Sequence, residues 1–303
     1  LGFNTLKTII EADKNVVDIS FFPEDGLQLD DLAKNRNVTA IIDCGVAPGM
    51  DNLILVYHDS QMKITDFECL VGGLPKVKKW PFCYKALFSP VDVIEEYTRP
   101  ARYVENFELV TKPALTDCEL VEFDNVGTLE SFNSDGLRSI LHTMKHIQNM
   151  KEKTLRYPGH VEYVKVLKES GFFDREIVDF KGMKLSSLEF TSKILFKEWR
   201  LEQNKKEMTI MRVRISGVNS FDAKEEITYY LHDEYDQPTE ISSMARTTGY
   251  SATAVANMIL HGKFSFKSVF PPELVGSKEG CFDYVMNYLN QRGVTYRKET
   301  LLI

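Results

Sequence analysis

The stretch IIDCGVAPGMDN, residues 41–52, interrupts an apolar run with two glycines and a proline and then leads into a second apolar run, LILVY. The first run is typical of a buried strand, and the second is typical of a helix. In an open parallel sheet, ligands bind beyond the carboxyl ends of the strands, where glycines let the backbone approach a ligand closely. Pro48 would fix that approach, and the first N–H groups of the helix could face an anion or a carbonyl. An ordinary strand–helix turn would explain the same residues, so both interpretations stay open at this point.

The composition is that of a globular protein without a nucleic-acid or membrane partner. The 303 residues are 43% hydrophobic and 27% charged, and the formal net charge of −7 is spread along the chain. A nucleic-acid surface would need clustered Lys and Arg. No run approaches the roughly 18–20 apolar residues of a membrane span. The five cysteines are odd in number and widely spaced, which argues against disulfides or a zinc site and favours the reducing cytoplasm.

The first fifty residues alternate between helix and strand. Amphipathic segments near 4–12 and 27–34 each precede an apolar strand, at 15–20 and 38–45, which predicts a parallel sheet covered on both faces. Alternating strands then become prominent, so we expect an α/β nucleotide-type domain joined to an α+β domain. The later expected elements are strands at 63–75, 207–217 and 225–235 and helices at 185–200, 247–263 and 281–291.

Two turns carry candidate site residues. DISFFPED (18–25) follows the strand next to 38–45, so Ser20 and Phe21 would line the same crevice as the glycine turn. In KTLRYPGH (153–160), Arg156 suits bidentate recognition of a carboxylate, and His160 could donate a proton near neutral pH. Each of these side chains could equally have a structural role.

Further candidates lie in SFNSDG (131–136), which offers Asn133 and Asp135, and in YKALFSP (84–90), which offers Lys85 as a carboxylate or proton partner. Helix capping and a solvated lysine are the plain alternatives. The sequence contains no GxSxG, HExxH, Walker or GxGxxG pattern, and its six histidines form no ligand set, so we predict no metal site.

Taken together, several motifs resemble the saccharopine dehydrogenase family, which includes saccharopine reductases, lysine 6-dehydrogenases and carboxynorspermidine dehydrogenases. They occur in the family's order over nearly the whole chain. The resembling stretches are VVDISFFPED, IIDCGVAPGMDN, VGGLP with YKALFSP, ESFNSDGLRS, TLRYPGH, MARTTGYSATAVANMIL and VFPPELVG.

The resemblance implies an NAD- or NADP-dependent oxidoreductase that acts on a C–N bond of an amino acid or polyamine derivative. It implies part of a Rossmann domain at 1–50, and a substrate and dimerisation domain with a mixed sheet at 51–246. Helices at 247–303 would return to the Rossmann side. It also implies a homodimer. A non-catalytic dimeric ligand-binding module that lost its nucleotide site is the alternative.

The resemblance also assigns roles to individual residues. Gly45, Val46, Ala47, Pro48 and Gly49 match the family's loop beside the nicotinamide. Ser20 and Phe21 match a Ser-Tyr pair between nicotinamide and substrate, Asn133 and Asp135 match a substrate loop, and Arg156 matches a carboxylate clamp. Lys85 matches a site-adjacent motif; like His160 it is only a weak catalytic candidate.

The sequence departs from the family pattern in two ways. Ala47 stands where saccharopine reductases have an Asp, and Phe21 replaces a Tyr, so the resemblance does not carry saccharopine over as the substrate. The family's first strand, its GxGxxG turn and the following acidic residue have no match here. We therefore expect these elements to belong to a longer chain.

Overall fold

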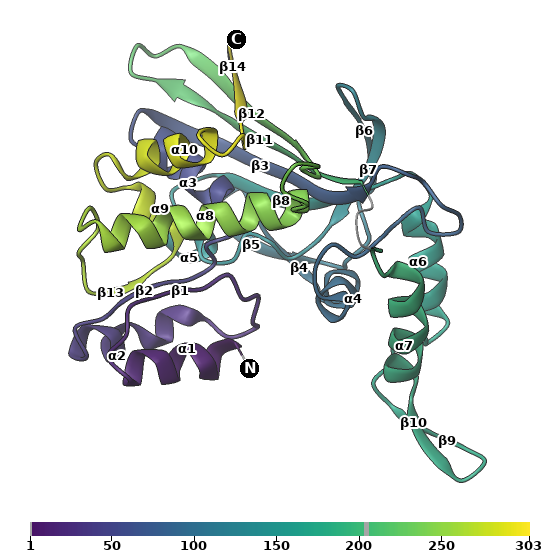
Figure 1. The fold of residues 1–303 in the computed structure, drawn as a ribbon. Coiled ribbons are helices and arrows are strands. Elements are labelled where there is room, and N and C mark those ends of the chain that lie inside the picture. The colour runs from purple at the N-terminus through teal and green to yellow at the C-terminus, as the bar shows by residue number, and fades with distance from the viewer. Residues whose placement is uncertain (1, 203–205) are drawn as a thin grey trace.

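The computed structural model describes residues 2–202 and 206–303, and a small parallel sheet forms its first layer (Figure 1). Strands β1 (Val16–Val17), β2 (Thr39–Ile41) and β13 (Ser268–Phe270) are parallel, with β2 in the middle. Helices α1 (Gly2–Glu11) and α2 (Asp30–Asn35), with the 3₁₀ turn η1 (Gly26–Leu29), cover one face. Leu6 and Ile10 of α1 are buried there against Ala40 and Val269.

A mixed sheet forms the second and larger layer. In space the order is β14 (Tyr296–Leu302), β12 (Lys224–Glu234), β11 (Glu207–Asn219), β3 (Met62–Pro75), β8 (Asn149–Arg156). Beyond β8, its first half pairs with β4 (Ala101–Glu105) and its second half with β7 (Gly127–Asn133). Strands β5 (Glu108–Lys112) and β6 (Glu119–Phe123) extend these two pairings. β3 and β8 run parallel, whereas the other neighbours are antiparallel.

Helices bury one face of the mixed sheet and link it to the parallel sheet. The main core contains residues of β3 and β11 together with α3 (Met50–Asp59), α8 (Ser243–Leu260) and α10 (Cys281–Asn290). The short helices α5 (Ile140–Thr143) and α9 (Pro272–Gly276) lie nearby, and α9 packs on α3. A second core around the buried Trp199 joins α4 (Pro90–Thr98), α6 (His160–Glu169) and α7 (Ser187–Trp199).

A hairpin projects from this second core (Figure 1). It consists of β9 (Ile177–Phe180) and β10 (Met183–Ser186), and β10 leads directly into α7. Its side chains Ile177, Phe180 and Met183 are 69%, 54% and 56% exposed. A two-stranded hairpin buries little apolar surface by itself, so this arm depends on contacts beyond its own strands for stability.

The predicted fold class is confirmed: a small parallel sheet is combined with a large mixed sheet. The domain boundaries at 50 and 246 stay predictions. The sequence did not indicate β13, which adds a late segment to the first sheet, or β14, which extends the mixed sheet. Helix α5 follows the SFNSDG segment, and the segment PPELVG contains α9. Within the described residues, no helix has the length and apolar character needed to cross a membrane.

Candidate functional site

The turn between β2 and α3 folds back on itself beside a cavity. The Gly45 N–H donates to the Pro48 carbonyl at 3.0 Å, and the Met50 N–H donates to the Gly45 carbonyl at 3.2 Å. Gly49 has φ +142°, and a Cβ there would lie 2.0 Å from the Gly45 oxygen. Its N–H donates to Asp51 Oδ1 at 2.9 Å, which ties the turn to the first turn of α3. Only glycine fits position 49, because the turn needs both the left-handed φ and the close approach.

The cavity has a volume of about 570 Å³ and opens at the carboxyl ends of β1 and β2. Its walls come from both sheets, from α4 and from the start of α8. The predicted residues that line it are Ser20, Phe21, Gly45, Val46, Ala47, Pro48, Asp135 and Arg156. Gly49, Asn133, Lys85 and His160 do not line it. Open α/β sheets bind their ligands at this place, beyond the carboxyl ends of the strands.

Two arginines hold Phe21 at the cavity. The guanidinium groups of Arg99 and Arg138 lie 4.9 Å and 4.6 Å from the centroid of its ring. Arg138 is itself fixed, because it donates to the Phe22 carbonyl at 2.6 Å and to Asp43 at 3.2 Å. These contacts give the aromatic ring a defined place without a hydroxyl group.

Arg156 is buried and its charge is already balanced. Its Nη2 donates to Glu96 Oε2 at 2.8 Å, its Nε donates to the Tyr97 hydroxyl at 3.3 Å, and its guanidinium lies 4.5 Å from the Tyr84 ring centroid. Burial raises the pKa of Glu96, and the charge of Arg156 opposes this shift. A ligand carboxylate at Arg156 would therefore compete with Glu96.

The two residues of the predicted substrate loop have different surroundings. Asp135 lines the cavity and accepts two hydrogen bonds of 2.9 Å from the Arg102 guanidinium. Asn133 is fully buried away from the cavity, where it accepts a hydrogen bond from the Tyr103 hydroxyl and donates to Thr116 and Asp117. Asn133 thus holds the loop that presents Asp135.

The two weak catalytic candidates also lie outside the cavity. Lys85 donates to the Glu198 carbonyl. His160 is buried, with Nδ1 2.9 Å from the Phe82 carbonyl and Nε2 2.9 Å from the Tyr97 hydroxyl. Burial, aided by the charge of Arg156, lowers the pKa of His160 to about 3. A neutral ring with its proton on Nδ1 satisfies both contacts, so His160 orients Tyr97 and, through it, Arg156.

Acidic side chains outnumber basic ones in the cavity wall, which the sequence did not reveal. Among the lining residues that the structure describes, the basic ones are Arg99 and Arg156. The acidic residues that line it are Asp43, Asp92, Glu95, Glu96, Asp135 and Glu152. Three of them come from α4, for which no sequence pattern predicted a role in the site. Glu152 lies two residues before the TLRYPGH motif, and no pattern marked it. Cationic groups are the ligands that such a wall favours.

Comparisons with known proteins match one family over most of this chain. The family model for the saccharopine dehydrogenase C-terminal domain matches residues 45–294. The carboxyaminopropylagmatine dehydrogenase of Synechocystis is 23% identical over 80% of this chain and 62% of its own. The NADP(+), L-glutamate-forming saccharopine dehydrogenase of Pyricularia oryzae is 26% identical over 63% of this chain and 45% of its own. The chain thus spans less than two thirds of these relatives.

The fold has a counterpart among solved structures. The apo L-Glu-forming saccharopine dehydrogenase of Saccharomyces cerevisiae superposes with a TM-score of 0.78 at 19% sequence identity, over 99% of this chain and 82% of the yeast chain. That likeness concerns the fold alone. The match of the family model over most of the sequence places this chain in the saccharopine dehydrogenase family.

Proposed function

We propose that this chain forms the substrate-binding part of an NAD(P)-dependent oxidoreductase that transfers hydride to or from an amine or imine carbon. The observation that carries the proposal is the single cavity in which the ends of two parallel strands meet an acid-rich wall from the mixed sheet and α4. Strand ends suit a nicotinamide, and carboxylates suit a cationic nitrogen.

Each side of the cavity has its own role in this proposal. Ser20 and the turn Gly45–Pro48 lie on the nicotinamide side. Phe21 and Asp135 contact the substrate, and Arg156 holds a substrate carboxylate. The bound cofactor supplies or accepts the hydride, and the protein residues orient the substrate and exclude water. Tight orientation of the reacting groups accounts for a large share of catalysis in reactions of this kind.

The substrate class we favour is a polyamine-type molecule with one carboxylate. The wall offers many more acids than bases, and the Synechocystis relative acts, by its name, on carboxyaminopropylagmatine. Ala47 and Phe21 make that part of the wall apolar, which would favour methylene groups between the charged ends. Whether NAD or NADP serves as cofactor depends on residues that contact the adenosine ribose.

We further propose a cytoplasmic homodimer. The arm of β9 and β10 exposes apolar side chains that a second subunit would cover. The described structure contains cysteines without disulfides, three of them buried, as is common in a reducing compartment.

The test uses the full natural protein. We expect reduction of NAD+ or NADP+, followed by absorbance, with carboxyaminopropylagmatine, and weaker or no reduction with saccharopine or lysine. Binding of these amines without any reduction of either nucleotide would contradict the oxidoreductase and favour the ligand-binding module. Reduction with saccharopine as the best substrate would leave the oxidoreductase intact and contradict the polyamine class.

A further inference from the structure

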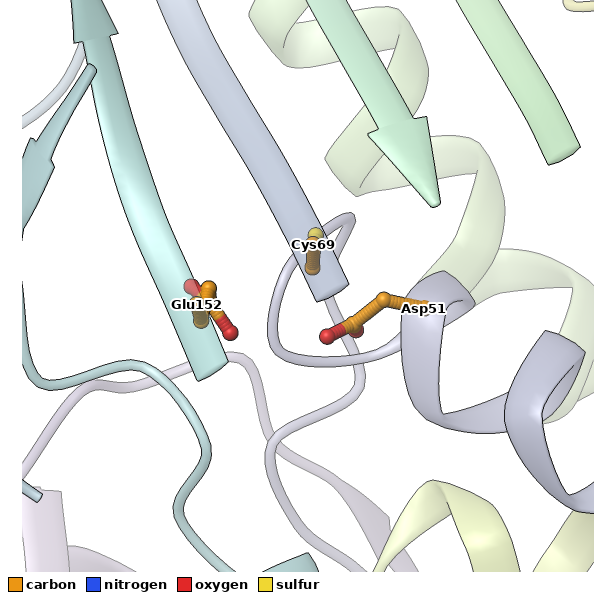
Figure 2. A group of neighbouring side chains, drawn as sticks. All are labelled: Asp51, Cys69 and Glu152. Atoms are coloured by element: carbon orange, nitrogen blue, oxygen red, sulfur yellow. The ribbon is translucent and has the colours of Figure 1, made fainter. Parts of the chain in front are cut away.

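Two buried carboxyl groups face one another beside the cavity, and one of them, Glu152, lines it (Figure 2). Asp51 comes from the first turn of α3 and Glu152 from β8, and their side chains are 0% and 4% exposed. Together with Cys69 of β3 they place three polar atoms within 4.8 Å of one another. Asp51 Oδ2 and Glu152 Oε2 have no hydrogen-bond partner among the described residues. Buried polar atoms without a partner are rare, and these two need an explanation.

The fold makes room for the Glu152 carboxyl at this place. A Cβ on Gly136 would lie 1.8 Å from Glu152 Oε1, so no other residue fits at position 136 without moving the carboxyl. Gly136 and Glu152 both line the cavity. The unpartnered oxygen therefore belongs to a carboxyl group that is held at the cavity wall by close packing.

Two ionised carboxylates at this separation would repel one another strongly in a buried site. Burial raises the pKa of Asp51 to about 7, and the charge of Glu273 adds to the shift. Burial also raises the pKa of Glu152 well above its ordinary value, and the charges of Asp51, Asp135 and Glu96 act in the same direction. The other titratable groups close to the pair are Cys69, Tyr103 and Tyr296. Both shifts favour the protonated form, so at neutral pH the pair holds at least one proton and carries at most one negative charge.

We propose that the Asp51–Glu152 pair is the amine site of the cavity: Glu152 binds the substrate nitrogen, and the pair exchanges a proton with it. The proposal rests on the proposed oxidoreductase. In the oxidative direction, one N–H bond of the substrate ammonium breaks and its proton passes to the monoanion, which becomes neutral. The nitrogen lone pair then forms the C=N bond as the C–H bond breaks, and the hydride passes to the oxidised nicotinamide nucleotide. The products are an iminium group and the reduced nucleotide.

The assignment also explains why Asp51 belongs to the turn that begins α3. Its Oδ1 accepts the Gly49 N–H, so this carboxyl is fixed and only Oδ2 is free to share a proton with Glu152. Asp51 is thus a positioning residue that sets the proton affinity of Glu152. Because burial raises the pKa of both carboxyl groups, the pair can hold and exchange a proton at physiological pH.

A first experiment needs no substrate. Infrared difference spectra of the full natural protein would be recorded between pH 5 and 10 for wild type and Glu152→Gln. We expect a carboxylic-acid C=O band at pH 7 that is lost at higher pH and is missing in the variant. Glu68→Gln is the matched control, because Glu68 is a buried glutamate of β3 that pairs instead with Lys151 and Arg212. Identical bands in wild type and Glu152→Gln would overturn the shared proton.

A second experiment measures amine binding with spermidine as the probe. Calorimetry should show at least tenfold weaker binding to Glu152→Gln, partial recovery in Glu152→Asp, and no change in Glu68→Gln. Equal binding to wild type and Glu152→Gln, or no binding to wild type, would overturn the amine site. So would a stoichiometric metal ion in the purified protein that is lost in Glu152→Gln.

These outcomes are separable from the failure of the proposed function. If spermidine binding depends on Glu152 but no nucleotide is reduced with any amine, the amine site stands and the oxidoreductase fails. If nucleotide reduction is seen and its kcat/KM has the same pH profile in wild type and Glu152→Gln, the oxidoreductase stands and the proton exchange is overturned.

Discussion

The buried guanidinium of Arg156 is paired with the carboxylate of Glu96, whose Oε2 lies 2.8 Å from Nη2, in the wall of the cavity. The pair keeps the charge of Arg156 compensated while the cavity holds no anion. Removing either partner leaves an uncompensated buried charge, which destabilises the fold. A substitution that retains the charge therefore tests the binding role more directly than one that removes it.

Arg156→Lys should weaken substrate binding and leave nucleotide binding unchanged. Lysine keeps the positive charge beside Glu96 but lacks the planar fork that binds a carboxylate with two hydrogen bonds. A charge-assisted hydrogen bond contributes about 1.5–3 kcal/mol, so we expect the substrate KM to rise about tenfold or more. Steady-state kinetics of the full protein measure both constants, and Arg212→Lys, which alters a pair with Glu68 outside the cavity, is the control. A parallel rise in both KM values would refute the clamp.

Glu96→Gln should have the opposite effect on substrate binding. Without the competing carboxylate, Arg156 becomes available to a ligand, and the substrate KM should fall several-fold. The ligand-free protein should lose about 1–3 kcal/mol of unfolding free energy, because a buried charge loses its partner. Denaturant unfolding with and without substrate distinguishes the two effects. A higher KM together with lower stability would show that Glu96 supports the site and does not compete for it.

Phe180→Asp combined with Ile177→Asp should convert a dimer into a monomer, because both exposed side chains lie on the projecting hairpin. A charge placed in an apolar interface must be desolvated, which opposes association. Sedimentation velocity reports the change directly. The control is Phe221→Asp, an equally apolar residue that is 88% exposed in the turn between β11 and β12. If the hairpin variant sediments like the wild type, the arm is not the dimer contact.

The parts of the site that the sequence indicated are contiguous motifs at the ends of parallel strands. Ser20, Phe21 and the turn Gly45–Pro48 could be expected together because neighbouring parallel strands end at the same edge of a sheet. The parallel sheet itself was visible only in part. Its third strand, β13, is three residues long and lies more than two hundred residues from β2, too short to show a period.

The acidic wall could not be read from the sequence because it depends on long-range register. β3 and β8 are parallel neighbours with Cys69 opposite Glu152, and the first turn of α3 brings Asp51 to them. Segments so far apart along the chain carry no local signal of their contact. The same limit applies to Asn133 and His160, whose motifs were recognised but whose side chains turn into the core to hold neighbouring residues.

Gly49→Ala should destabilise the protein and disturb the nicotinamide side of the cavity. The φ of +142° is unfavourable for alanine, and the added Cβ would lie 2.0 Å from the Gly45 oxygen. We expect a loss of more than about 2 kcal/mol of unfolding free energy, from the sum of backbone strain and steric overlap. Gly249→Ala is the control for stability alone, because this position of α8 borders the open space of the cavity and alanine favours a helix. Equal stability of the two variants would mean that the turn can adopt another conformation.

The unfolding free energy should fall as the pH is lowered from about 6.5, and His160 should be one cause. Its pKa is about 3 in the folded protein, because the ring is buried, against an ordinary value of 6.5. Between these values the unfolded chain binds a proton that the folded protein does not, so this stability is present above pH 6.5 and is lost as the pH falls toward 3. One such group contributes a slope of at most about 1.4 kcal/mol per pH unit. His58, whose pKa burial lowers to about 4, adds a second contribution in the same range.

Urea unfolding of wild type and His160→Gln between pH 4.5 and 7.5 should show a shallower dependence of the unfolding free energy on pH for the variant. The control variant His142→Gln, at an exposed position of α5, should retain the wild-type slope. Parallel slopes for wild type and His160→Gln would mean that the folded protein accepts the proton on His160. The contact to Tyr97 would then not require a neutral ring.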